Sequence, residues 1–196
     1  MTDQYLTVSS QQTGEGYYTE KRSKFLSFAH HVESADEVKQ WVDTYRKRYY
    51  DARHTCYAYR LGPEGADSRA NDDGEPSGTA GKPIQGQLVA RALTDTLVVV
   101  VRYYGGVNLG TGGLVVAYRE AAALALDNAA TETRLVEEQV EYEFPYVMMN
   151  SVMRVVKELG PRIVAQDFDN TCRITLAIRR SEAQRLRERL QKLSFE

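Results

Sequence analysis

The sequence predicts an α+β protein of two domains, and three stretches carry this prediction. Residues 98–118 read as a buried strand, a glycine-rich loop and a helix, because valines precede the glycines and apolar residues recur at helical spacing after them. Residues 135–196 follow the order strand, helix, strand, strand, helix. Between these stretches, at residues 128–133, an alanine-rich helix gives way to polar residues. We therefore expect a flexible arm at 1–16, a first domain at 17–130 and a second at 131–196.

Composition favours a soluble protein of the cytoplasm. The 196 residues include 25 basic and 27 acidic side chains, a formal net charge of −2, so any binding to nucleic acid must be local. Two cysteines, Cys56 and Cys172, are typical of free thiols in a reducing compartment. Neither a signal peptide nor an apolar run of membrane-spanning length occurs, and we expect no membrane contact.

The first elements have clear local signals. Residues 17–32 alternate loosely and predict one long strand or a hairpin. Ser34 and Glu37 form a capping box that opens a helix with an apolar stripe. Residues 53–61 predict a strand in which His54 and Cys56 share one face. Because neither CxxC nor HxxxH accompanies this H-x-C spacing, no metal site is expected.

An acidic loop, residues 72–81, follows in the stretch NDDGEPSGTAGKP. Its glycines and prolines exclude a regular element, and Pro83 suits the first turn of a helix at 84–92. Asp72, Asp73 and Glu75 could bind a divalent cation or act as paired acids. A solvated Asp-Gly turn explains the same residues, and both interpretations stay open.

A glycine loop, residues 105–113, separates the strand of valines from the next helix. With no Cβ, its glycines allow positive φ and close approach of a backbone or a ligand. They match neither the P-loop, because Leu114 follows Gly113 where a lysine is required, nor GxGxxG. Free N–H groups at the helix start could hold an anion there. A tight structural loop is the alternative.

The second half of the sequence shows patterns of strands and helices throughout. Residues 135–144 predict a strand, and Pro145 opens a helix that Gly160 and Pro161 end. Residues 162–168 and 171–178 predict strands joined by a turn at Asp169 and Asn170. Ser181 and Gln184 are expected to cap the last helix. This order is that of a ferredoxin-like fold whose last strand is missing.

Long motifs in the first domain resemble the YigZ/IMPACT family, in particular its bacterial two-domain YigZ branch. They are Arg53-His54, DDGEPSGTAGKP at 72–83 and VVRYYGGVNLGTGGLVVAY at 100–118. The resemblance covers nearly the whole chain in length and order. The chain departs from the family at Val115-Val116, where a Val-Lys pair is common, and at the missing last strand.

The resemblance carries implications for fold and role. It implies a first domain like domain 2 of ribosomal protein uS5 and a second, ferredoxin-like domain resembling the fifth domain of elongation factor G. Eukaryotic IMPACT relatives regulate translation under starvation. A ribosome- or RNA-associated role is therefore implied by likeness of fold.

We accordingly expect a non-enzymatic regulator of translation that binds RNA or the ribosome through one face carrying both loops. Arg102 and Lys82 are expected to present cations beside the two helix starts. The candidate nucleic-acid- or phosphate-binding residues are Arg53, His54, Thr79, Gly81, Lys82, Arg102, Tyr103, Tyr104, Gly105, Gly106, Gly110, Gly112 and Gly113.

Two alternatives remain. One is a small-molecule enzyme that binds a nucleotide or a phosphate at this face, with magnesium held by Asp72, Asp73 and Glu75. Otherwise no cofactor is expected, and no nucleophile and base can be assigned from the sequence. The other alternative is a module that binds a protein partner.

Overall fold

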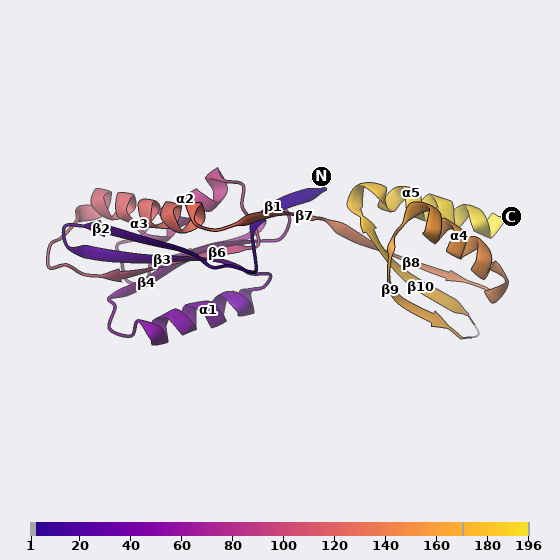
Figure 1. Ribbon diagram of the computed structural model, residues 1–196, viewed down its shortest axis with the longest axis horizontal. Coiled ribbons are helices and arrows are strands. Elements are labelled where there is room, and N and C mark those ends of the chain that lie inside the picture. Colours follow the sequence, from indigo (N-terminus) through magenta and orange to yellow (C-terminus); the bar gives the residue numbers. More distant parts are fainter. Residues whose placement is uncertain (1–2, 170, 196) are drawn as a thin grey trace. The chain divides into compact units, whose positions relative to one another are not determined.

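The computed structural model describes residues 3–169 and 171–195, and the chain divides into two compact units (Figure 1). The N-terminal unit is Tyr5–Arg134, and the C-terminal unit is Leu135–Glu196 together with Met1–Gln4. Elements lying wholly or mostly in the N-terminal unit are β1 (Gln4–Val8), β2 (Gly14–Glu20), β3 (Ser23–His31), α1 (Ala35–Arg48), β4 (His54–Leu61), β5 (Asp67–Asn71), α2 (Gly81–Ala90), β6 (Thr96–Tyr103), α3 (Gly110–Asp127) and β7 (Thr131–Leu135).

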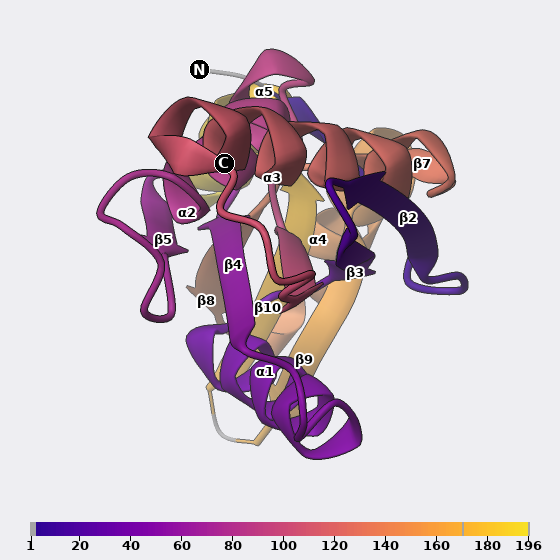
Figure 2. The same ribbon diagram turned by 90° about the vertical axis from the view of Figure 1, so that its left-hand side faces the viewer.

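An antiparallel sheet in the order β2-β3-β6-β4-β5 forms the middle layer of the N-terminal unit. Helix α1 covers one face of this sheet, and α2 and α3 cover the other (Figure 2). Strand β6 lies at the centre and is buried along almost its whole length, as its run of valines predicted. Strands β1 and β7 pair with each other in a separate two-stranded sheet.

Local sequence signals explain the first hairpin of this sheet and the start of the helix that follows it. Strands β2 and β3 form a hairpin whose two-residue turn, Lys21 and Arg22, has φ of 45° and 66°. Helix α1 begins at the predicted cap, since Ser34 Oγ accepts a hydrogen bond of 3.2 Å from the Glu37 N–H. The chain is therefore mixed α+β, as expected.

The C-terminal unit has its own sheet and core. Its further elements are β8 (Glu137–Phe144), the 3₁₀ turn η1 (Tyr146–Met148), α4 (Met149–Leu159), β9 (Arg162–Phe168), β10 (Cys172–Arg179), α5 (Arg180–Lys192) and η2 (Leu193–Phe195). The strands pair antiparallel in the order β8-β10-β9, and α4 and α5 bury their apolar stripes against this sheet. Gly160, with φ of 67°, ends α4. Within the described residues the chain continues after α5 as η2, without a further strand.

Several expectations differ from the structure. Residues 1–16, expected to be a flexible arm, contain β1 and the start of β2. Strand β5 was not expected, because its sequence, DSRAN, lacks apolar alternation and its pairing with β4 is a tertiary effect. The predicted turn includes Asn170, which lies outside the described residues.

The cap of α5 is also different. Ser181 does not cap this helix locally; its N–H and hydroxyl donate to the carboxylate of Asp3 at 2.9 and 2.8 Å. Both residues belong to the C-terminal unit, so its last helix is capped from the other end of the chain. Among the described helices, none is long and apolar enough to cross a membrane.

Candidate functional site

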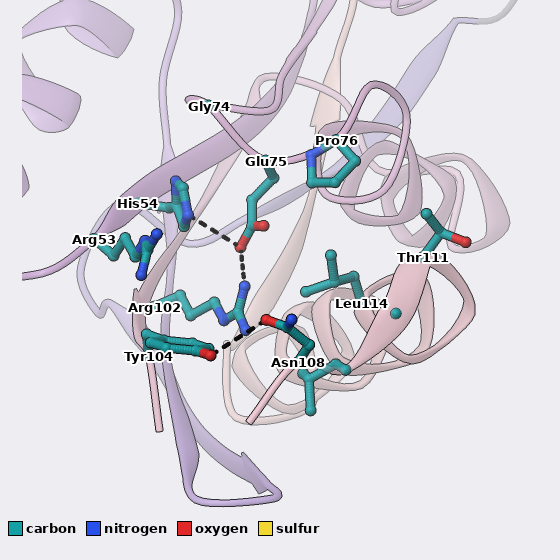
Figure 3. Close-up of a pocket in the computed structure, with 12 residues that line it drawn as sticks. Arg53, His54, Gly74, Glu75, Pro76, Arg102, Tyr104, Asn108, Thr111 and Leu114 are labelled. Carbon is teal, nitrogen blue, oxygen red and sulfur yellow. Dashed lines mark hydrogen bonds and ion pairs between the residues drawn. The ribbon is translucent and has the colours of Figure 1, made fainter. Parts of the chain in front are cut away.

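The acidic loop and the glycine loop line one pocket of about 430 Å³ in the N-terminal unit (Figure 3). The start of β4, the end of β6 and the start of α3 complete its wall. Its lining residues are Arg53, His54, Gly74, Glu75, Pro76, Arg102, Tyr104, Asn108, Leu109, Gly110, Thr111 and Leu114. The two loops therefore lie together, with Arg53 and His54 beside them.

Glu75 is the centre of the hydrogen bonding in this pocket. Its Oε1 accepts from Arg102 Nη1 at 2.6 Å and from the Tyr118 hydroxyl at 2.7 Å. His54 Nε2 lies 3.7 Å from the same oxygen. Only 8% of Glu75 is exposed, and burying a carboxylate without such hydrogen-bond partners is costly. Glu75 is thus a buried anchor and not a solvated turn residue.

Arg102 differs most from expectation. It was expected to emerge beside the glycine loop, yet only 5% of it is exposed. Its Nη1 pairs with Glu75, and Nη2 donates to Ser23 Oγ at 3.4 Å. Its Nε is buried and has no hydrogen-bond partner among the described residues. Arg102 therefore lines the pocket as the buried partner of an ion pair with Glu75.

His54 is oriented by the acidic loop. Strand pairing sets His54 opposite Arg102, and His54 Nδ1 lies 2.7 Å from the carbonyl oxygen of Asp73. Because a carbonyl can only accept, Nδ1 carries the proton of that bond. Nε2 is therefore the ring nitrogen that faces Glu75 (Figure 3).

Tyr104 and Arg53 form the outer part of the pocket. The Arg53 guanidinium lies over the Tyr104 ring, 4.9 Å from its centroid. The Tyr104 hydroxyl donates to Asn108 Oδ1 at 3.2 Å. Tyr104 is 39% exposed and Arg53 is exposed as well, so an aromatic surface and a cation are both accessible from solvent.

The N-termini of α2 and α3 differ in whether a side chain caps them. Asp72 closes the start of α2, because its Oδ1 accepts from the N–H groups of Ala80 and Gly81 at 3.1 and 2.8 Å. Its Oδ2 accepts from the Gly78 N–H at 2.8 Å. By contrast, α3 has no side-chain cap and no acidic residue in its first turn. Of these two described helices, α3 is the one that offers an open N-terminus to the pocket.

The acidic loop is mainly structural. Partial desolvation raises the pKa of Asp72, but the backbone hydrogen bonds from Gly78, Gly81 and Ala80 outweigh it and hold that pKa below its usual value. Asp73 accepts from the Thr55 N–H at 2.6 Å and pairs with Arg46 at 3.1 Å. Within the described part of the chain, no group of three His, Cys, Asp or Glu residues is arranged to hold a metal ion.

Other candidate residues lie outside the pocket lining. Thr79 is buried and donates to the Pro76 carbonyl at 2.6 Å, whereas Lys82 is exposed on α2. Gly81 packs against β5, where a Cβ would lie 2.6 Å from the Asn71 nitrogen. Tyr103 donates to Asp51 at 2.8 Å, and desolvation followed by this bond raises its pKa to about 12.

The glycines of the glycine loop divide into two kinds. A Cβ on Gly105 would lie 2.1 Å from the Arg22 carbonyl carbon, so this glycine permits close backbone packing. Gly110 lines the pocket with φ of 70°. Gly112 and Gly113 line a neighbouring pocket of about 240 Å³, and Gly106 lines neither.

Sequence reasoning missed several residues of the site. Tyr118 was read only as part of the apolar stripe of α3, but its hydroxyl holds Glu75. Its spacing from Leu114 and from the start of α3 places it on the sheet-facing side of the helix, which was the available signal. Asn108, Thr111, Gly74 and Pro76 lie inside the motifs without having been singled out.

Comparison with known proteins gives consistent matches. The family described as "Impact N-terminal domain" matches residues 21–126. "IMPACT family member YvyE" of Bacillus subtilis (strain 168) is 33% identical over 158 residues, 81% of this chain and 72% of that protein. "IMPACT family member YigZ" of Escherichia coli (strain K12) is 34% identical over 150 residues, 76% of this chain and 74% of that protein. A crystal structure of a hypothetical protein superposes with a TM-score of 0.77 at 28% identity, over 99% of this chain and 94% of that chain.

Proposed function

The chain belongs to the IMPACT family, as its long motifs predicted, and on this premise we propose that it is a translation-associated protein that binds RNA or the ribosome. In this proposal it acts in the cytoplasm and contacts phosphate groups through the pocket between the acidic loop and the glycine loop. Binding, and not catalysis, is its primary role.

One observation carries the proposal: the uncapped start of α3 opens into the pocket that Arg53 and Arg102 also line. Backbone N–H groups and the positive end of the helix dipole favour an anion at that place. Asp72 already occupies the corresponding place on α2. The contrast points to α3 as the helix start that is left for an external anion.

The outer part of the pocket fits a nucleotide chain. Single-stranded RNA is bound through phosphate contacts and through stacking of bases on aromatic rings. Arg53 supplies an exposed cation, and the ring of Tyr104 is accessible beside it. A local site of this kind needs no strongly basic protein, which agrees with the net charge of −2.

The finer fold assignments belong to this proposal as well. We assign the N-terminal unit to the fold of uS5 domain 2 and the C-terminal unit to the ferredoxin-like fold. The order β8-α4-β9-β10-α5 and the sheet order β8-β10-β9 support the second assignment.

Ribosome co-sedimentation tests the function. The wild-type protein should pellet with ribosomes at about 50 mM salt and less at about 200 mM, because phosphate contacts weaken with salt. Arg53→Ala should reduce the pelleted fraction. Lys82→Ala is the matched control, because Lys82 is an exposed cation outside the pocket lining.

The outcome separates the alternatives. Equal pelleting of Arg53→Ala and wild type, or pelleting that does not depend on salt, would contradict phosphate binding at this pocket. A salt-independent ribosome fraction would instead indicate a protein partner. A thermal shift produced by nucleotides without any ribosome association would favour the small-molecule enzyme.

A further inference from the structure

The pocket holds more unused hydrogen-bond donors than acceptors. The first turn of α3 carries backbone N–H groups without a side-chain cap. Thr111 contributes a hydroxyl, and the Asn108 amide nitrogen is unused, because only its Oδ1 has a partner among the described residues. On the acceptor side, Glu75 Oε1 accepts from both Arg102 and Tyr118, which leaves Oε2 of this carboxylate as an acceptor. A ligand that suits this wall must bring several acceptor atoms.

A second and independent observation points the same way. Only 5% of Arg102 is exposed, and its buried Nε has no hydrogen-bond partner among the described residues. Leaving a buried charged donor unpaired is costly, so such groups are rare in native proteins. Arg102 also lines the pocket, so a buried guanidinium that is not fully paired forms part of the wall that a ligand meets.

We propose that the pocket binds a phosphomonoester: the terminal phosphate of an RNA end or of a free nucleotide. This inference rests on the proposed function and specifies its ligand. A monoester offers three terminal oxygens and a charge near −2 at neutral pH, whereas an internal phosphodiester offers two oxygens and a charge of about −1. The donor supply of the α3 start, Thr111 and Arg102 matches the larger number.

Charges in the pocket agree with a dianion. Arg53 and Arg102 bring two cations against the single carboxylate of Glu75. The open end of α3 adds about half a positive charge. Arg102 is held in place by Glu75 and Ser23, so the site is built before the ligand arrives. The accessible ring of Tyr104 lies at the outer side, where the base next to the phosphate can stack.

Fluorescence anisotropy with a short single-stranded RNA tests the inference. The same sequence is used with a terminal phosphate, at its 5′ or its 3′ end, and with hydroxyl ends only. A phosphorylated end should bind at least about tenfold more tightly, because it adds charge-assisted hydrogen bonds. Competition by a nucleoside monophosphate and by inorganic phosphate shows whether a free nucleotide is also accepted.

Thr111→Asp is the informative variant, with Thr111→Asn as its neutral control. The aspartate places a carboxylate at the start of α3, as Asp72 does at the start of α2. The helix should keep its stability or gain a little, because an acidic group suits a helix N-terminus. The preference for phosphorylated ends should disappear in Thr111→Asp and persist in Thr111→Asn.

The possible results separate this inference from the proposed function. Equal affinity for phosphorylated and hydroxyl ends would overturn the monoester inference and leave RNA binding intact. Binding of nucleoside monophosphates without binding of any RNA would support the monoester site and overturn the proposed function. A folded Thr111→Asp variant that still prefers phosphorylated ends would overturn the assignment to α3.

Discussion

Arg102 Nη1 lies 2.6 Å from Glu75 Oε1, and the two side chains are only 6% and 3% exposed. Removing one partner of so buried a pair leaves an uncompensated charge. Glu75→Gln should therefore lower the free energy of unfolding by about 3 kcal/mol, measured by urea denaturation. The double variant Glu75→Gln, Arg102→Met should lose less than the sum of the single losses.

A matched exposed pair provides the control. Arg91 Nη1 also lies 2.6 Å from a carboxylate oxygen, that of Asp127, but these side chains are 31% and 59% exposed. Asp127→Asn should cost less than about 1 kcal/mol. Similar losses for Glu75→Gln and Asp127→Asn would show that the Glu75 pair is not buried in solution.

The cap formed by Asp72 is open to test by substitution and pH. Asp72→Ala removes the acceptor of three backbone N–H groups and should cost about 2 kcal/mol. Asp72→Asn keeps one acceptor oxygen and should cost less. Thermal melts with and without magnesium distinguish the cap from a cation site, since magnesium should not change the ranking.

The stability that Asp72 contributes should depend on pH, and the sign of this dependence is definite. The pKa of Asp72 is lower in the folded protein than its ordinary 3.8, so the folded state favours the ionised form. Its contribution is present above pH ~4 and is lost as the pH falls through the lowered pKa. A difference between wild type and Asp72→Asn that grows on acidification would contradict the cap.

Alanine substitutions distinguish the glycines of the glycine loop. Gly105→Ala should destabilise the protein by about 2 kcal/mol or more, because its Cβ would clash with the Arg22 backbone. Gly112→Ala should be neutral or stabilise by up to about 1 kcal/mol, because its helical site has open space. Urea denaturation measures both. Equal losses would show that the loop packs differently.

His30 should make the fold sensitive to mild acid. Its ring stacks on Trp41 with centroids 3.7 Å apart, and desolvation lowers its pKa from 6.5 to about 4. The unfolded chain therefore binds a proton that the folded protein rejects between these values. Stability should fall by up to about 3 kcal/mol as the pH drops from 6.5 to 4. His30→Gln should flatten this slope, and an unchanged slope would contradict burial of the ring.

Local patterns predicted much of the architecture. The buried valines of β6, the Ser34 cap of α1 and the apolar stripe of α3 depend on neighbours in the sequence. Local sequence patterns are therefore enough to predict these features. The meeting of the two loops also followed, because each leads into a helix on the same face of the sheet.

What could not be predicted depends on partners distant in sequence. Glu75 and Tyr118 are 43 residues apart and meet only after α3 packs on the sheet. The burial of Arg102 had a signal that was not used: it continues the alternation of Val98 and Val100, which face the core beneath α2 and α3. Its charge suggested a surface position, and the carboxylate that compensates it comes from another loop.

The bond between Asp3 and Ser181 has a consequence for biosynthesis. The two residues are 178 positions apart, so a ribosome delivers the aspartate long before the helix that it caps. The N-terminal unit can fold while translation continues, since Tyr5–Arg134 contains its own core. Asp3 is thus made before the N-terminal unit but reaches its final position only after α5 has been made.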